Sequence, residues 1–130
     1  MQLGYTIVYV PDVAASLAFF ESAFGLQRRC LHESGPYGEL DTGPTALAFA
    51  SHALGAGNLP GGYVAASASE QPLGMDIGLV TDDVAEAHAR ALAAGAREVS
   101  PPAGKPWGQV VSYLRAPDGT LVELCTPVVG

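Results

Sequence analysis

The chain has 130 residues, 48% hydrophobic and 15% charged, which excludes an intrinsically disordered protein and fits a single globular domain. With 6 basic and 13 acidic residues its formal net charge is -7, too few cations for a phosphate-binding surface, so we expect no nucleic-acid partner. No basic leader and no membrane-length apolar run is seen, which predicts a cytoplasmic protein without a membrane partner. Cys30 and Cys125 lack metal-ligand spacing and are expected to be free thiols.

The first elements along the chain have the pattern of a strand followed by a helix. Residues 5–10 are β-branched or aromatic on both sides, as in a strand. Apolar side chains recur at intervals of three and four over residues 13–24, which predicts a helix that Gly25 caps. Three short strands are then expected, at residues 27–33, 38–42 and 45–51.

A segment rich in Gly, Ala, Ser and Pro separates the two halves of the sequence, from residue 52 to residue 74. It is long for a connection within a compact domain. The apolar run at residues 63–66 argues against complete disorder. The segment is therefore expected to be either a linker or a loop over a pocket.

The same order of elements then returns. Residues 77–80 predict a strand, and Asp83 with Glu86 has the spacing of a capping box that begins a helix ending at Gly95. Three strands are expected after it, at residues 97–101, 109–115 and 120–126. Asp12 and Asp83 are both followed by Val-Ala and lie 71 positions apart. The repeated order and the repeated helix start indicate a duplicated module.

Two motifs, one in each half, carry a family resemblance. The first is YVPDVAASLAFF at residues 9–20, followed by FGL at 24–26, and the second combines PWGQ at 106–109 with PDGTLVEL at 117–124. Together they resemble the signatures of the vicinal oxygen chelate superfamily, which includes glyoxalase I, bleomycin resistance proteins and extradiol dioxygenases. The resemblance covers essentially the whole chain and does not distinguish one activity from another.

The resemblance implies an α+β fold of two tandem βαβββ modules whose curled mixed sheet surrounds a cup-shaped pocket. Module one is expected at residues 1–52, the connecting loop at 53–74 and module two at 75–130. Members of the superfamily usually form dimers, so we expect a homodimer. Enzymatic members hold a divalent metal in the cup through four His, Gln or Glu side chains, two from each module.

At the four positions where the family has metal ligands, this sequence has only two side chains able to bind a metal. The positions fall on Tyr5, Leu47, Asp76 and Glu123. Glu123 matches the family pattern, and Asp76 is able to bind but is shorter than the usual His. Leu47 has no ligand atom, and a neutral tyrosine is a poor ligand for a hard divalent ion. We therefore expect no cofactor and no tightly bound metal, with a divalent metal held by Glu123 and Asp76 as the alternative.

The three histidines do not complete the predicted metal site. His32 and His52 lie at positions that do not match the family ligands, and either is the candidate for a third ligand if a metal binds. His88 falls inside the second predicted helix and is expected to be exposed to solvent.

Strand alternation predicts the walls of the cup. If Tyr5 faces the cup then Tyr9 does as well, and Leu121 accompanies Glu123. The walls are mostly apolar and aromatic, as in small-molecule sites. The predicted ligand-binding residues are Tyr5, Tyr9, Leu47, Phe49, Asp76, Trp107, Tyr113, Leu121 and Glu123. Trp107 is expected to close the open end of the sheet, to stack on a flat ligand, or to do both.

The missing metal ligands, the aromatic walls and the acidic net charge predict a binding function, and the carboxylate of Glu123 needs an explanation in any case. A carboxylate in an apolar cup needs a partner, a proton or solvent. The partner is either a cationic ligand or one of the basic residues Arg28, Arg29, Lys105 and Arg115. The sequence favours a protein that binds a small aromatic or cationic molecule without changing it, as bleomycin resistance proteins do.

Two other functions stay open. One is a lyase, isomerase or dioxygenase of the glyoxalase type, with Glu123 as a metal ligand or as a general base. The other is a dimeric domain that binds a regulatory metabolite in the same pocket.

Overall fold

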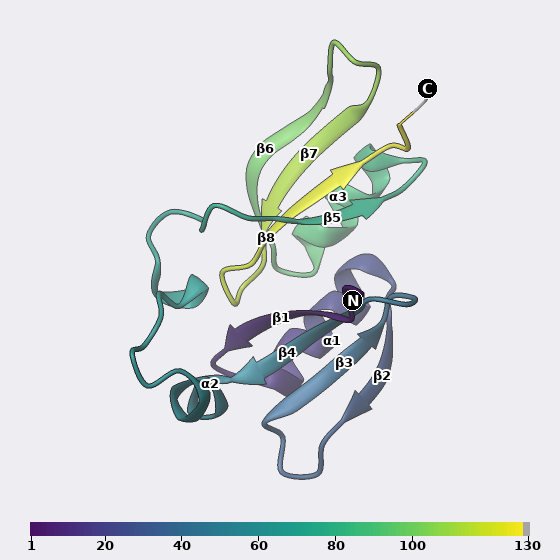
Figure 1. Cartoon of the computed structure of the whole chain (residues 1–130). Coiled ribbons are helices and arrows are strands. Elements are labelled where there is room, and N and C mark those ends of the chain that lie inside the picture. Colours follow the sequence, from purple (N-terminus) through teal and green to yellow (C-terminus); the bar gives the residue numbers. More distant parts are fainter. Residues whose placement is uncertain (129–130) are drawn as a thin grey trace.

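Two βαβββ modules follow one another in the computed structural model, which describes residues 1–128 (Figure 1). Module one consists of β1 (Tyr5–Val10), α1 (Val13–Phe24), β2 (Gln27–Leu31), β3 (Tyr37–Asp41) and β4 (Ala46–Ser51). Module two consists of β5 (Ile77–Val80), α3 (Val84–Ala93), β6 (Arg97–Gly104), β7 (Val110–Arg115) and β8 (Leu121–Cys125). The predicted α+β fold of two tandem modules is confirmed.

Each module forms one mixed sheet, and the two sheets have the same topology. Their strand orders are β1-β4-β3-β2 and β5-β8-β7-β6. The first strand of each module runs parallel to the last, whereas the other neighbours are antiparallel. β1 and β5 are the edge strands that lie nearest the middle of the molecule (Figure 1), and they are not hydrogen-bonded to each other. The two sheets therefore do not close into a barrel.

Both long helices begin at the aspartates that mark the repeat. The side chain of Asp12 accepts a hydrogen bond from the backbone N–H of Ala15 at 3.0 Å, and Asp83 accepts one from Glu86 at 3.1 Å. Each bond pairs a backbone donor that the first helical turn leaves free. Gly25 ends α1 with φ +69°, the left-handed conformation that glycine adopts without strain. These local signals explain why both helix starts were predictable.

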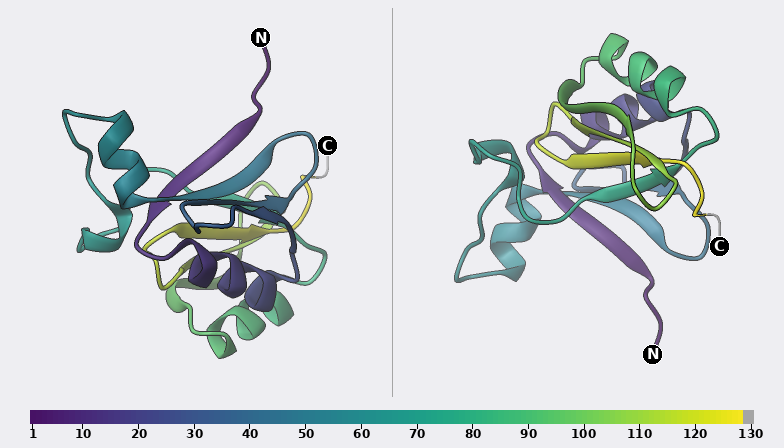
Figure 2. Two further views of the ribbon diagram at one scale, coloured as in Figure 1. Left: turned by 90° about the horizontal axis from the view of Figure 1, so that it is seen from below. Right: turned by 90° about the horizontal axis from the view of Figure 1, so that it is seen from above.

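The core lies between the sheets and the two helices, which pack side by side against each other (Figure 2). Phe20 of α1 and Phe49 of β4 are both fully buried, with ring centroids 5.1 Å apart. A buried hydrogen bond of 2.6 Å joins Ser16 Oγ in α1 to Asp118 Oδ2 in the turn before β8. One continuous core therefore includes residues of both modules.

His88 is buried, contrary to the expectation that it is exposed. Its Nδ1 lies 2.8 Å from Ser112 Oγ in β7, and its Nε2 lies 2.8 Å from Glu98 Oε2 in β6. Val84 and Ala91, four residues before and three after it, are buried on the same side of α3. That spacing places His88 on the core-facing side, and both ring nitrogens have polar partners there.

The connecting segment packs against both modules. It contains the helix α2 (His52–Asn58) and the short 3-10 helix η1 (Ala66–Ala68). The buried guanidinium of Arg115 donates to the backbone carbonyls of Ala66, Ser69 and Glu70 at 2.8, 2.6 and 2.9 Å. Of the two predicted roles, the structure supports a loop over a pocket.

Two further sequence predictions concern the cysteines and the membrane. Cys30 and Cys125 are free thiols, as expected. Among residues 1–128, no helix combines the length and the apolar character needed to cross a membrane.

Candidate functional site

The candidate site lies on the face of each sheet that is turned away from α1 and α3, here called the outer face. In β1 the side chains alternate, so that Val10 is buried against the helix while Tyr5 is 58% and Ile7 41% exposed. Tyr9 lies on the same outer face, and its ring packs 5.0 Å from that of Tyr63 in the connecting segment. The outer face of module one therefore presents an open row of aromatic and aliphatic side chains.

The placement of Leu47 and Phe49 in the cup was wrong. β4 pairs in parallel with β1 so that Phe49 lies opposite Val8, and both residues belong to the core. Phe49 packs against Phe20 of α1. Every position from Ala46 to Ala50 is apolar, so the sequence of β4 shows no alternation that distinguishes its two faces. The small side chain of Ala48 lies on the outer face instead.

Module two carries a group of polar side chains on its outer face, which we call the carboxyl cluster: Asp76, Tyr113 and Glu123. Tyr113 lies opposite Glu123 in the β7–β8 ladder and donates its phenolic O–H to Glu123 Oε1 at 2.7 Å. This hydrogen bond, together with burial and the nearby carboxylate, raises the pKa of Tyr113 to about 12. Partial burial, the charge of Glu123 and a hydrogen bond to it raise the pKa of Asp76. The ionised form of Asp76 is therefore disfavoured beside the second carboxylate.

The basic residues that the sequence offered as partners for Glu123 are held elsewhere. Arg28 and Arg29 pair with acidic residues of module one at 2.7 and 3.0 Å, and Arg115 binds backbone carbonyls. Lys105 forms no ion pair within the described residues. In the part of the chain that the structure describes, Glu123 therefore has no cationic partner.

The residues of one chain do not fit the four-ligand divalent metal site of the superfamily. Glu123 lies opposite Gly78, and its counterpart in module one, opposite Ile7, is Ala48 rather than Leu47. Neither alanine nor leucine has a ligand atom. Within residues 1–128, no group of three or more His, Cys, Asp or Glu side chains is placed to hold a metal ion. The carboxyl cluster supplies two carboxylates and a neutral phenol.

His32 and His52 do not complete a metal site at the carboxyl cluster. The ring of His32 packs edge-to-face on Tyr37 at a centroid distance of 5.5 Å. His52 Nδ1 lies 2.7 Å from the hydroxyl of Tyr63 in the connecting segment. Both histidines therefore have partners within module one and the connecting segment.

Trp107 does not close the end of a sheet. It lies in the turn between β6 and β7, is 63% exposed, and donates its indole N–H to Gln109 Oε1 at 2.7 Å. A side chain that filled the end of the sheet would be buried. Trp107 is also absent from the walls of the pocket described next. Gly108, with φ +97°, makes this segment a turn and carries Trp107 away from the cup.

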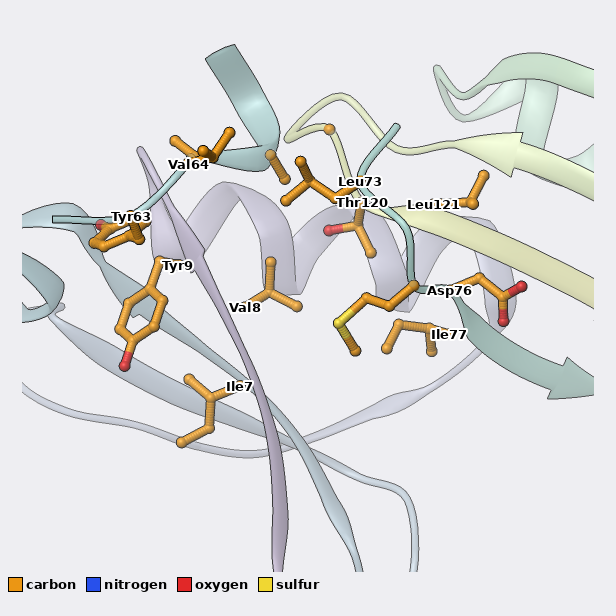
Figure 3. Close-up of a pocket in the computed structure, with 14 residues that line it drawn as sticks. Ile7, Val8, Tyr9, Tyr63, Val64, Leu73, Asp76, Ile77, Thr120 and Leu121 are labelled. Carbon is orange, nitrogen blue, oxygen red and sulfur yellow. The ribbon is translucent and has the colours of Figure 1, made fainter. Parts of the chain in front are cut away.

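A pocket of about 140 Å³ lies where the two modules meet the connecting segment, and we call it the seam pocket (Figure 3). Its walls come from β1, from residues 63–66 and 73–77 of the connection, and from residues 119–121 at the start of β8. Of the predicted site residues, it includes Tyr9, Asp76 and Leu121. The carboxylate of Asp76 points away from the other walls, whereas the Thr120 hydroxyl points toward them (Figure 3).

Sequence reasoning missed several walls of the seam pocket: Tyr63, Val64, Leu73 and Thr120. The apolar run at 63–66 was a signal for the first two, because it stands out in a polar connection. Thr120 had no such signal, because its role depends on a connection that passes over it from a distant part of the sequence. Tyr113 and Glu123 lie outside the seam pocket.

We expect the Asp76→Asn variant to have a higher melting temperature than the wild type at neutral pH. Because the folded state raises the pKa of Asp76, ionising this carboxyl costs stability above the folded-state pKa, and the cost vanishes below the unfolded value of about 4. The difference in melting temperature should therefore shrink as the pH falls below about 4. It should also be small, because Asp76 is an exposed residue.

Thermal unfolding followed by circular dichroism at several pH values tests this expectation. Asp82→Asn removes an equal charge from an exposed residue and controls for net charge. A difference that does not change with pH, or a lower melting temperature at neutral pH, would contradict it.

A known protein family and several solved structures match this chain. The family model described as Glyoxalase/Bleomycin resistance protein/Dioxygenase superfamily matches residues 2–124. No curated protein matches the chain. A glyoxalase-related enzyme from Fulvimarina pelagi superposes with a TM-score of 0.82 at 21% identity, over 98% of this chain and 88% of that one.

Two other solved structures share the fold. A glyoxalase/bleomycin resistance protein/dioxygenase family enzyme from Burkholderia phytofirmans gives a TM-score of 0.80 at 23% identity, over 99% of this chain and 100% of that one. TioX from a Micromonospora species gives 0.68 at 21% identity, over 97% and 98%. The family model spans nearly the whole chain, and these structures have the same architecture. The chain therefore belongs to the glyoxalase/bleomycin resistance protein/dioxygenase superfamily.

Proposed function

We propose that the chain binds a small aromatic or cationic organic molecule at the outer faces of its sheets, without a tightly bound metal. The observation that carries this proposal is the carboxyl cluster, in which Asp76 and Glu123 share one site with no cation among the described residues. A cationic group would pair with the ionised carboxyl, and a flat ring would pack on the exposed aromatic row of β1.

We further propose that a second copy of the chain completes the cup. Tyr5 and Ile7 are 58% and 41% exposed on an apolar outer face, which a lone chain leaves open to water. The carboxyl cluster of module two and the row of Tyr5, Ile7 and Tyr9 on β1 are complementary walls for an amphipathic cation. Light scattering of the purified protein should therefore give twice the mass of one chain.

A metal-free enzyme is the second candidate, and the raised pKa of Asp76 favours it. A carboxyl with a raised pKa is a candidate general acid, and a neighbouring carboxyl is a candidate base. A protonated Asp76 would donate to a carbonyl oxygen while Glu123 takes a proton from the neighbouring carbon. This is the chemistry of an isomerase or a lyase, and it uses only residues that the chain supplies.

The Glu123→Gln variant is expected to bind cationic aromatic compounds at least about tenfold more weakly than the wild type. A hydrogen bond to a charged group contributes about 1.5–3 kcal/mol, which corresponds to a tenfold or larger change in affinity. Cationic aromatic amines are screened against the wild type by titration calorimetry. The affinity of the best compound is then measured for the wild type and for Glu123→Gln.

Glu21→Gln is the matched control. Glu21 lies on α1, away from the outer faces of the sheets, and pairs with Arg28 at 2.7 Å. Its substitution should leave affinity unchanged. Equal losses of affinity in both variants would contradict a site at the carboxyl cluster.

The fate of the bound compound distinguishes the two candidate functions. A compound recovered unmodified supports the binder, whereas a product that Glu123→Gln no longer forms supports the enzyme. A divalent ion retained after dialysis and lost in Glu123→Gln would overturn the metal-free proposal.

A further inference from the structure

We propose that the seam pocket is a separate binding site for a compact, uncharged, mostly apolar molecule with one hydrogen-bonding group, which the Thr120 hydroxyl binds. The proposal does not depend on a ligand at the carboxyl cluster. Only Asp76 of that cluster lines this pocket, with its carboxylate pointing away from the other walls, and Tyr113 and Glu123 are not part of it.

The Thr120 side chain is buried, and its hydroxyl is unpaired among the described residues. Thr120 is only 6% exposed, and among residues 1–128 its Oγ1 has no hydrogen-bond partner. Its backbone is fully paired, since its N–H donates to Asp118 Oδ1 at 2.9 Å and its carbonyl accepts from Ala116 N–H at 2.9 Å. A buried hydroxyl without a partner is unfavourable and uncommon in folded proteins. The free group of this turn is therefore the hydroxyl. Its oxygen is almost fully covered, so a ligand pairs with it once a wall side chain shifts.

The oxygen of the Thr120 hydroxyl points into the seam pocket, toward the side on which Val8 and Tyr9 lie (Figure 3). A threonine hydroxyl both donates and accepts one hydrogen bond, so an alcohol, a phenol or a carbonyl group is able to pair with it.

The remaining walls of the seam pocket are mostly apolar. They include Val8, Val64, Leu73 and the flexible thioether of Met75. The carboxylate of Asp76 points away from this interior (Figure 3). An ionised group placed here would lose its hydration without gaining a counter-charge. The pocket therefore selects an uncharged ligand.

The volume limits the size of the ligand. The pocket measures about 140 Å³. Apolar protein cavities of about 150 Å³ hold benzene, so this pocket has room for about one six-membered ring with a short substituent.

The connecting segment is anchored on both sides of the pocket. Arg115 donates to the carbonyls of Ala66, Ser69 and Glu70, which holds the connecting segment in place over the pocket. On the other side, Tyr63 packs on Tyr9 and its hydroxyl lies 2.7 Å from His52 Nδ1. These contacts spare a ligand the entropy cost of ordering the backbone of the connecting segment.

Benzyl alcohol and toluene are the probes that test the proposal, because they differ by one hydroxyl on the same ring. NMR titration of the full chain gives the ratio of the two affinities, which is the preference for benzyl alcohol, and should show that benzyl alcohol shifts the methyl signals of Val8 and Leu73. Thr120→Val replaces the hydroxyl by a methyl group of similar size, and it should lower this preference by up to about tenfold. Thr120→Ser retains the hydroxyl and should retain the preference.

Two further measurements separate this site from the carboxyl cluster and from a folding defect. Without ligand, Thr120→Val should melt at the same or a higher temperature than the wild type, because it removes an unpaired buried hydroxyl. Glu123→Gln should leave benzyl alcohol affinity unchanged. The proposal is overturned if benzyl alcohol does not bind at millimolar concentration, if Thr120→Val keeps the preference, or if Glu123→Gln abolishes binding.

Discussion

Replacing Gly119 with alanine is expected to destabilise the protein by at least about 2 kcal/mol. Gly119 has φ +93°, where a side chain strains the backbone at a cost of about 1–3 kcal/mol. A Cβ at this position would also lie 2.3 Å from the backbone carbonyl oxygen of Ala66 in the connecting segment. Backbone does not move aside as a flexible side chain does, so the connecting segment must shift. Urea unfolding followed by circular dichroism measures the loss.

Gly43→Ala is the matched control for Gly119→Ala. Gly43 has a similar φ of +90°, but a Cβ there meets no atom within 4 Å. The control therefore reports backbone strain alone, and the difference between the two variants reports the contact with the connecting segment. If both variants lose the same stability, the close approach of Ala66 to the turn at Gly119 is not a real constraint.

Replacing Arg115 with methionine is expected to cost about 2–4 kcal/mol and to release the connecting segment. The buried guanidinium binds four backbone carbonyls, of which three belong to the connecting segment and one to Gly119. Methionine fills part of the space but leaves these carbonyls without their charged donor. Urea unfolding measures the stability, and limited proteolysis should show faster cleavage within residues 60–74.

Arg97→Met is the control for the loss of charge. Arg97 lies directly opposite Arg115 in the β6–β7 ladder and is exposed. Its substitution should change stability by less than about 0.5 kcal/mol. Arg115→Lys keeps the charge but not the planar fork of donors, and it should fall between the wild type and the methionine variant. Unchanged proteolysis in Arg115→Met would contradict the proposed anchoring role.

The fold was predictable because its signals are local. Asp12 and Asp83 cap their helices through side chains that bind N–H groups three residues later, and such spacing can be read directly from a sequence. The repeat made the prediction stronger, since the same local pattern occurs twice. The prediction that His88 is exposed was wrong. Val84 and Ala91, which lie at helical spacing from it, are apolar and place His88 on the buried side of α3.

The site was less predictable because it depends on pairing between distant segments. Which face of β4 carries Phe49 is decided by its register with β1, and an all-apolar strand does not encode that choice. The seam pocket brings together β1, the connecting segment and the turn at Thr120, which lie far apart in sequence. Glu123 was predicted to point into the cup and lies on the outer face of β8, where it accepts a hydrogen bond from the Tyr113 hydroxyl rather than pairing with one of the four basic residues.

The contact between α1 and α3 also determines how the protein unfolds. The buried bond from Ser16 to Asp118 and the bond of 3.0 Å from Arg90 Nε to the carbonyl of Ser22 both cross from one module to the other. Melting of one half would expose the helix of the other half to water, so we expect the two halves to unfold in one cooperative transition. A calorimetric scan should then show a single peak, although the sequence contains the module twice.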